Sequence, residues 1–135
     1  YLGTMVAGFP NLFILQGPNT GLGHSSVIFM MEAQIMHMQK VIKHMRTKYY
    51  DVIQPTHQAQ QRFVEETSKA MQQTVWSLGG CESWYIDQTG RNSTIWPSFT
   101  FTYRQLASKF KAEDYEGHLA GIPSMNPTPL LHPAK

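Results

Sequence analysis

The sequence predicts an α/β fold, and three consecutive features near its start carry the prediction. A short apolar run, Leu12-Phe13-Ile14-Leu15, leads into a loop rich in glycine and small polar residues, and a long amphipathic pattern follows. Short continuous apolar runs are typical of strands that a parallel sheet buries on both faces. We therefore expect a central parallel strand over residues 9–16, a loop over residues 17–26 and then a helix.

The helix is predicted from apolar residues that recur at steps of three and four from about Ser26. The recurring positions are Ile28, Met31, Ile35, Met38, Ile42 and Met45. Further apolar residues widen this surface over the first half of the pattern, as expected for a core helix packed between layers; they are Phe29, Met30, Met36 and Val41. Lys40, Lys43 and Arg46 gather near the end, where cations complement the helix dipole.

The next segment predicts a short extended stretch over residues 50–54 and a second, mostly polar helix of about 18 residues from Gln58. One side of that helix carries Phe63, Ala70, Met71, Thr74 and Val75. Because its remaining surface is polar, we expect it to lie on the outside of the fold.

The C-terminal half predicts less regular structure. Residues 81–104 are rich in aromatic and β-branched residues with a turn at 87–90, which favours irregular strands or a loose hairpin. A short helix is expected near 103–110, and the proline-rich tail from Gly117 should be extended or disordered. We divide the chain into residues 1–56, 57–116 and 117–135.

Composition excludes several classes of protein. The formal charge of +2 is too small for many phosphate contacts, so no nucleic-acid partner is expected. The longest apolar run, from Val27 to Met31, is far shorter than the roughly 20 residues that span a bilayer. The single cysteine, Cys81, suits a reducing compartment, so we expect a cytoplasmic protein. The first residue is Tyr1, and we interpret the chain as a piece of a longer one.

The loop before the long helix is the segment best suited to chemistry. Peptide N–H groups and the positive end of the helix dipole point toward Gly17-Pro18-Asn19-Thr20-Gly21-Leu22-Gly23-His24, and Ser25 follows. Its spacing lacks the third glycine of a dinucleotide fingerprint and the lysine of a P-loop. On residue physics alone, an ordinary strand-to-helix turn is the favoured interpretation.

Two longer motifs resemble a known family. The runs Tyr1-Leu2-Gly3-Thr4 and GFPNLFILQGPNTGLGHSSVIFMMEAQI (residues 8–35) look like the C-terminal part of flavin-dependent Baeyer–Villiger monooxygenases, especially the 4-hydroxyacetophenone monooxygenase-like branch. The later runs Cys81-Glu82-Ser83-Trp84-Tyr85, Gly90-Arg91-Asn92 and Trp96-Pro97 resemble a second motif of that branch. The likeness extends over residues 1–109, and the motifs stand in the family's order.

The resemblance implies a doubly wound FAD/NAD(P)-binding fold, to which this segment supplies the last parallel strand, the long core helix, a second helix and an irregular β segment. It implies FAD and NADPH as cofactors, with the loop beside the flavin ring. The implied flavin-side residues are Gly17, Pro18, Asn19, Thr20, Leu22, Gly23, His24 and Ser25. Trp84 matches a tryptophan that contacts the nicotinamide cofactor in similar enzymes.

The implied reaction inserts one atom of O₂ into a small ketone or aldehyde. The family's dinucleotide fingerprints and active-site arginine lie upstream of Tyr1, so we expect no catalytic residue in this chain and no activity of the isolated piece.

Two alternatives stay open. One is an N- or S-oxygenating flavin monooxygenase, and another is a non-catalytic folding or association module. An exposed methionine-rich helix face would also favour self-association of the piece. The histidines lack ligands at metal-binding spacing, and His37 and His44 fall near the polar edge of the helix, so no metal site is expected.

Overall fold

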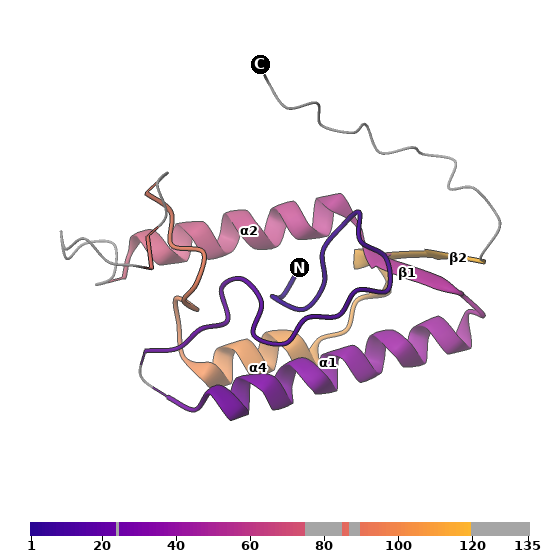
Figure 1. Cartoon of the computed structure of the whole chain (residues 1–135), viewed down its shortest axis with the longest axis horizontal. Helices are drawn as coiled ribbons and strands as arrows, with labels where there is room; N and C mark the ends of the chain where they lie inside the picture. Colours follow the sequence, from indigo (N-terminus) through magenta and orange to yellow (C-terminus); the bar gives the residue numbers. More distant parts are fainter. Residues whose placement is uncertain (24, 75–84, 87–89, 120–135) are drawn as a thin grey trace, which may run out of the picture.

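The structure is a computed structural model that describes residues 1–23, 25–74, 85–86 and 90–119. The elements in this part run in the order α1 (Val27–Thr47), β1 (Val52–Pro55), α2 (His57–Gln72), α4 (Thr100–Ser108), the 3₁₀ turn η1 (Ala112–Asp114) and β2 (Tyr115–His118). Helices α1 and α4 lie side by side, α2 lies on the opposite side, and the N-terminal segment winds between them (Figure 1).

Helix α1 confirms the predicted long helix, and it begins directly after Ser26, a residue type that caps helix N-termini. The side chain of Ser26 accepts a hydrogen bond from the backbone N–H of Phe29 at 3.3 Å, which satisfies one free donor of the first turn. His44 and Arg46 stand in the last turn, where positive charge suits the helix dipole.

The buried face of α1 differs from the predicted apolar stripe. Ile28, Ile35 and Ile42 are 69%, 42% and 43% exposed. The face turned toward the rest of the molecule consists of Met30, Ala33, Gln34, His37 and Val41. The periodicity of a sequence shows only where its apolar residues lie. It does not show that a glutamine or histidine can be buried because a hydrogen-bond partner lies on the inner face. The helix is apolar on two sides, as expected for a helix between two layers. The described residues cover only one of these two sides.

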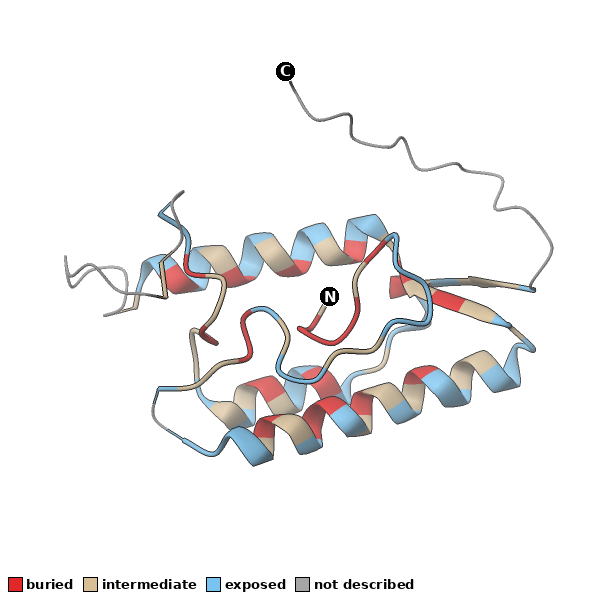
Figure 2. Ribbon diagram, viewed as in Figure 1, coloured by how far each residue is buried: buried red, intermediate tan, exposed pale blue. Residues whose placement is uncertain are grey.

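The core lies around the N-terminal segment (Figure 2). Leu2 belongs to a cluster with Trp96, which precedes α4, and with residues of α1, α2 and α4, namely Met30, Ala33, Phe63, Tyr103 and Ala107. Met5 belongs to a second cluster with Val41, Ile53 and Tyr115. Residues 1–7 therefore act as the centre on which the helices and the small sheet pack. The predicted division of the chain into three parts, at residues 56 and 116, stays a prediction.

Residues 9–16, expected as a buried parallel strand, form no strand in this structure. The backbone N–H of Ile14 donates to Thr4 at 2.8 Å, and that of Gln16 donates to the side chain of Gln34 at 3.1 Å. Leu12 and Leu15 are each 42% exposed. A parallel strand needs a ladder of bonds to a neighbouring strand, whereas among the described residues this run makes a single backbone bond to a strand, from Asn11 to Ile53 of β1 at 2.9 Å.

The small sheet consists of β1 and β2, which pair antiparallel with Val52 opposite His118 and Pro55 opposite Tyr115. Strand β1 confirms the predicted extended stretch, shifted by a residue or two. The start of the proline-rich tail is extended, as expected, and forms the end of β2; residues 120–135 lie outside the described part.

Helix α2 confirms the second predicted helix. The side chain of Thr56 caps it by accepting a bond from Ala59 at 3.1 Å. Its buried side carries Ala59, Phe63, Thr67 and Met71, whereas most of its other residues face solvent (Figure 2). Thr74, expected on the same helix, follows its end, and Val75 lies outside the described residues.

The predicted irregular β segment is present only in part. Ile86 and Asn92 form one antiparallel bridge, and Ile95 forms a parallel bridge with Gly21. Helix α4 begins at Thr100, earlier than expected, so residues 100–104 are helical although their composition favours strand. Packing of α4 along α1 overrides that local preference. Residues 81–84 and the expected turn residues 87–89 lie outside the described part.

Candidate functional site

The loop over residues 17–26 stands immediately before α1, as predicted. Gly17, at the start of the loop, packs directly against the backbone of Gly3. A side chain at position 17 would overlap the carbonyl group of Gly3. The hydroxyl of Thr20, which is fully buried, donates to the carbonyl of Gly17 at 2.6 Å and closes the first turn of the loop. Gly23 and Ser25 are exposed at the positive end of the helix.

Asn19 occupies a different environment from the exposed part of the loop. It is only 4% exposed, and its backbone has the left-handed φ of 58° that asparagine tolerates better than most residues. Its side-chain Nδ2 donates to the carbonyl of Asn92 at 3.0 Å and to that of Ile95 at 3.1 Å. The loop is therefore bound to a segment more than seventy residues further along the chain.

Asn92 is a functional candidate to which sequence reasoning gave no role, although it stands in the motif Gly90-Arg91-Asn92. Its side-chain Oδ1 accepts bonds from the backbone N–H groups of Thr94 and Ile95, each at 3.1 Å. These bonds fix the orientation of the amide. Its Nδ2 is buried and has no hydrogen-bond partner among the described residues. The motif Gly90-Arg91-Asn92 was the only sequence signal that could have indicated it.

A cavity of about 280 Å³ lies between the loop, the N-terminal segment and α2. Pro18, Asn19 and Ser93 line it on the loop side. Met5 and Phe63 are among the apolar residues on its other walls. The candidate loop thus borders both solvent at the start of α1 and an internal space behind Asn19.

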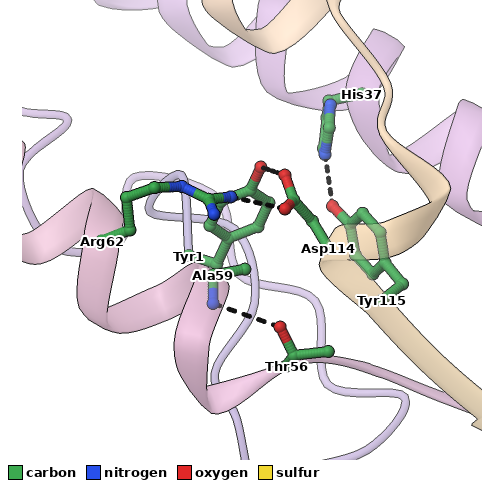
Figure 3. A network of polar contacts seen from close by, with 7 residues as sticks. All are labelled: Tyr1, His37, Thr56, Ala59, Arg62, Asp114 and Tyr115. Atoms are coloured by element: carbon green, nitrogen blue, oxygen red, sulfur yellow. Dashed lines mark hydrogen bonds and ion pairs between the residues drawn. The ribbon is translucent and has the colours of Figure 1, made fainter.

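A separate polar network lies inside the fold (Figure 3). The carboxylate of Asp114 accepts a hydrogen bond from the Tyr1 hydroxyl at 2.6 Å and forms an ion pair with Arg62 of α2. Close by, the two ring nitrogens of His37 contact the carbonyl of Ala107 and the hydroxyl of Tyr115. The network joins α1, α2 and the start of β2.

His37 corrects the expectation of a histidine at the polar edge of the helix. It is 1% exposed, and burial lowers its pKa below the ordinary value of 6.5. A carbonyl can only accept, so Nδ1 carries the proton toward Ala107 and Nε2 accepts from Tyr115. Burial also raises the pKa of the Tyr115 hydroxyl. Neutral, mutually satisfied groups of this kind hold a core together.

The predicted site residues are brought together only in part. Gly17, Pro18, Asn19 and Thr20 form the inner part of the loop, and Leu22, Gly23 and Ser25 form its outer part; His24 and Trp84 lie outside the described residues. Among the described residues, no group of three or more histidine, cysteine, aspartate or glutamate side chains could hold a metal ion. No helix in this part is long and apolar enough to cross a membrane.

Comparison with known proteins gives close relatives over nearly the whole chain. A Baeyer–Villiger monooxygenase of Pseudomonas aeruginosa is 44% identical over 124 residues, which is 91% of this chain. A second, from Streptomyces coelicolor, is 36% identical over 115 residues. This chain belongs to the Baeyer–Villiger monooxygenases. It spans 23% and 22% of the lengths of these two family members, so it corresponds to a part of their sequence.

Solved structures of other proteins share the fold. The structure of OTEMO in complex with FAD and NADP matches 87% of this chain and 23% of its own length, with a TM-score of 0.69 and 24% identity. The match confirms the α/β class. No protein-family model matches the chain.

Proposed function

We propose that this chain forms part of an FAD- and NADPH-dependent Baeyer–Villiger monooxygenase that inserts one oxygen atom of O₂ into a small ketone or aldehyde. The observation that carries the proposal is the 44% identity to a Baeyer–Villiger monooxygenase over 91% of the chain. Identity at this level over a single continuous alignment includes the loop and the helix start to which the flavin-side residues were assigned.

The described residues fit a flavin at the outer part of the loop. Gly23 and Ser25 are exposed next to the first turn of α1, where peptide N–H groups have no partner within the helix. These groups and the helix dipole favour the negatively polarised edge of a reduced flavin. The buried amide of Asn92, which has no partner among the described residues, lies beside Asn19 in the inner part of the same loop.

In this arrangement the loop residues act by binding and orienting. Gly17 and Thr20 fix the loop, and Gly23 and Ser25 would hold the flavin ring. The roles of His24 on the flavin side and of Trp84 on the nicotinamide side stay predictions. FAD, when bound and reduced by NADPH, supplies the reaction with O₂. We infer that the chain shapes the cofactor's environment and does not supply a general acid or base.

The proposal is tested on the natural polypeptide that contains this chain. We expect the purified protein to hold FAD and to oxidise NADPH in proportion to conversion of a ketone into an ester, measured by absorbance and by product mass. Ester formation supports the proposal, whereas oxygenation only of amines or sulfides would assign it to another subclass of flavin monooxygenase. A polypeptide without flavin would refute both.

The isolated chain of 135 residues is expected to be inactive. It contains no GxGxxG fingerprint, so nothing in it would bind the adenine dinucleotide portion of either cofactor. The measurement is NADPH oxidation with added FAD, using the natural polypeptide at equal concentration as the positive control. Ketone-dependent NADPH oxidation by the isolated chain would contradict the prediction.

A further inference from the structure

We propose that Asn19 is a positioning residue that holds residues 90–96 against the flavin-side loop, and so sets the NADPH side of the site relative to the flavin. The inference rests on the proposed function, which assigns the loop to FAD and Trp84, in the motif that precedes residues 90–96, to NADPH. It changes the role of Asn19 from a direct flavin contact to a link between two motif-bearing segments.

The side chain of Asn19 carries the first part of this link. A carboxamide has two N–H donors, and the donor atom of Asn19 contacts two carbonyls, those of Asn92 and Ile95, at 3.0 and 3.1 Å. With only 4% of the residue exposed, the amide is turned into the protein. Its donors are therefore used within the chain and are not available to a flavin.

The backbone carries the second part. The N–H of Asn19 donates to Ser93 at 2.7 Å, and the N–H of Gly21 donates to Thr94 at 2.8 Å. In return, the N–H of Trp96 donates to Gly21 at 2.9 Å. Three backbone bonds and two side-chain bonds thus join the two segments over a few residues on each, which leaves little freedom between them.

The sequence of the loop is suited to this junction. Asn19 has a φ of 58°, which glycine and asparagine adopt at low cost. A Cβ atom on Gly21 would lie 2.8 Å from the carbonyl oxygen of Thr94, so only glycine allows the segments to approach this closely. The requirement for glycine at position 21 arises from contact with Thr94.

The junction extends toward the NADPH motif. Asn92, whose carbonyl accepts from Asn19, also pairs with Ile86 in an antiparallel bridge. Loosening the Asn19 bonds would therefore loosen Asn92 and, through the bridge, Ile86, which stands two residues after Trp84 in the sequence. We expect the effect to appear in NADPH binding and not in flavin retention.

The test replaces Asn19 with glycine in the natural polypeptide that contains this chain. Asn19→Gly keeps the left-handed backbone and removes both side-chain bonds. The expected result is an unchanged FAD content with a KM for NADPH that rises about tenfold, while kcat changes less. Asn19→Asp retains the shape of the side chain but lacks both donors, so it should raise the same KM.

Asn11→Gly is the matched control. Asn11 also has a left-handed φ, 59°, and its amide also bonds the backbone twice, donating to Asp51 and accepting from Ile53 at 3.0 Å each. Its contacts fix β1, away from the junction. We expect this variant to leave the KM for NADPH unchanged.

Each result decides the inference. Loss of FAD from Asn19→Gly with an unchanged KM for NADPH would make Asn19 a flavin contact, and an equal rise in KM in Asn11→Gly would indicate general loosening. If Asn19→Gly does not fold, Asn19→Asp provides the same measurement. Wild-type protein that does not oxidise NADPH refutes the proposed function and this inference together, whereas active wild type with unaffected Asn19 variants refutes the inference alone.

Discussion

Replacing Tyr103 with alanine is expected to lower the local free energy of unfolding around α4 by about 3–5 kcal/mol, the usual cost of removing a buried aromatic side chain. Tyr103 is fully buried, its ring packs edge-on against Trp96 at 5.3 Å, and its hydroxyl donates to the carbonyl of Leu2 at 2.6 Å. The substitution therefore removes both a ring from the core and the bond that ties α4 to the N-terminal segment.

Amide hydrogen exchange of peptides from α1 and α4 measures the effect locally, within the natural polypeptide. A loss of this size should speed exchange limited by local opening by at least about a hundredfold. Tyr103→Phe is the control, because it keeps the ring and removes only the hydroxyl; it should cost about 1–2 kcal/mol. Equal effects of the two variants would mean that the hydrogen bond to Leu2, and not ring packing, dominates.

Acidification is expected to destabilise the packing of α1 against α4 and β2 through His37. Burial lowers the pKa of His37 in the folded state, so the unfolded state binds a proton more readily. The contribution of His37 to the free energy of unfolding is thus constant at pH values above 6.5, the pKa of histidine in the unfolded state. The free energy of unfolding falls as the pH drops below that value. The slope should approach about 1.4 kcal/mol per pH unit until the folded pKa is reached.

The groups that face His37 set the size of this effect. Lys40 on the same helix lowers the pKa further, whereas Asp114 and the carbonyl of Ala107 raise it, and desolvation outweighs both opposing effects. The measurement is hydrogen exchange of α1 and α4 peptides at pH 7 and pH 5.5. His37→Gln should reduce the pH dependence, and His44→Gln, on the same helix but only half-buried, should retain it. An undiminished slope in His37→Gln would assign the acid sensitivity to other groups.

The helices were predictable because their signals are local. Ser26 and Thr56 cap α1 and α2 with their own side chains, and the apolar spacing of each helix lies within the segment itself. The structure of residues 9–16 was not predictable in this way. A strand forms only beside a neighbouring strand, and the composition of Leu12 to Leu15 contains no information about such a neighbour. The early start of α4 was missed for the same reason, since its contacts with α1 outweigh the strand preference of its first residues.

The candidate site was predicted as a set of residues and not as a geometry. The motifs indicated the loop over residues 17–25 and the segment around residues 81–92, and the family assignment is confirmed. Nothing in the spacing of Asn19 and Asn92 shows that they bond to each other, because hydrogen bonds between residues so distant in sequence depend on how the chain folds back. His24 and Trp84 keep their predicted roles untested, since they lie outside the described residues.

The sequence by itself therefore determined the family, the long helix with its cap and the loop from which a flavin site is proposed. Tertiary structure decided which face of α1 is buried, and it did so against hydrophobicity: His37 and Gln34 lie inside while Ile28 and Ile35 are exposed. The physical reason is that burial of a polar group depends on its partner. His37 finds Tyr115 and Ala107, and Asn19 finds Asn92 and Ile95, only when segments far apart in the chain are brought together.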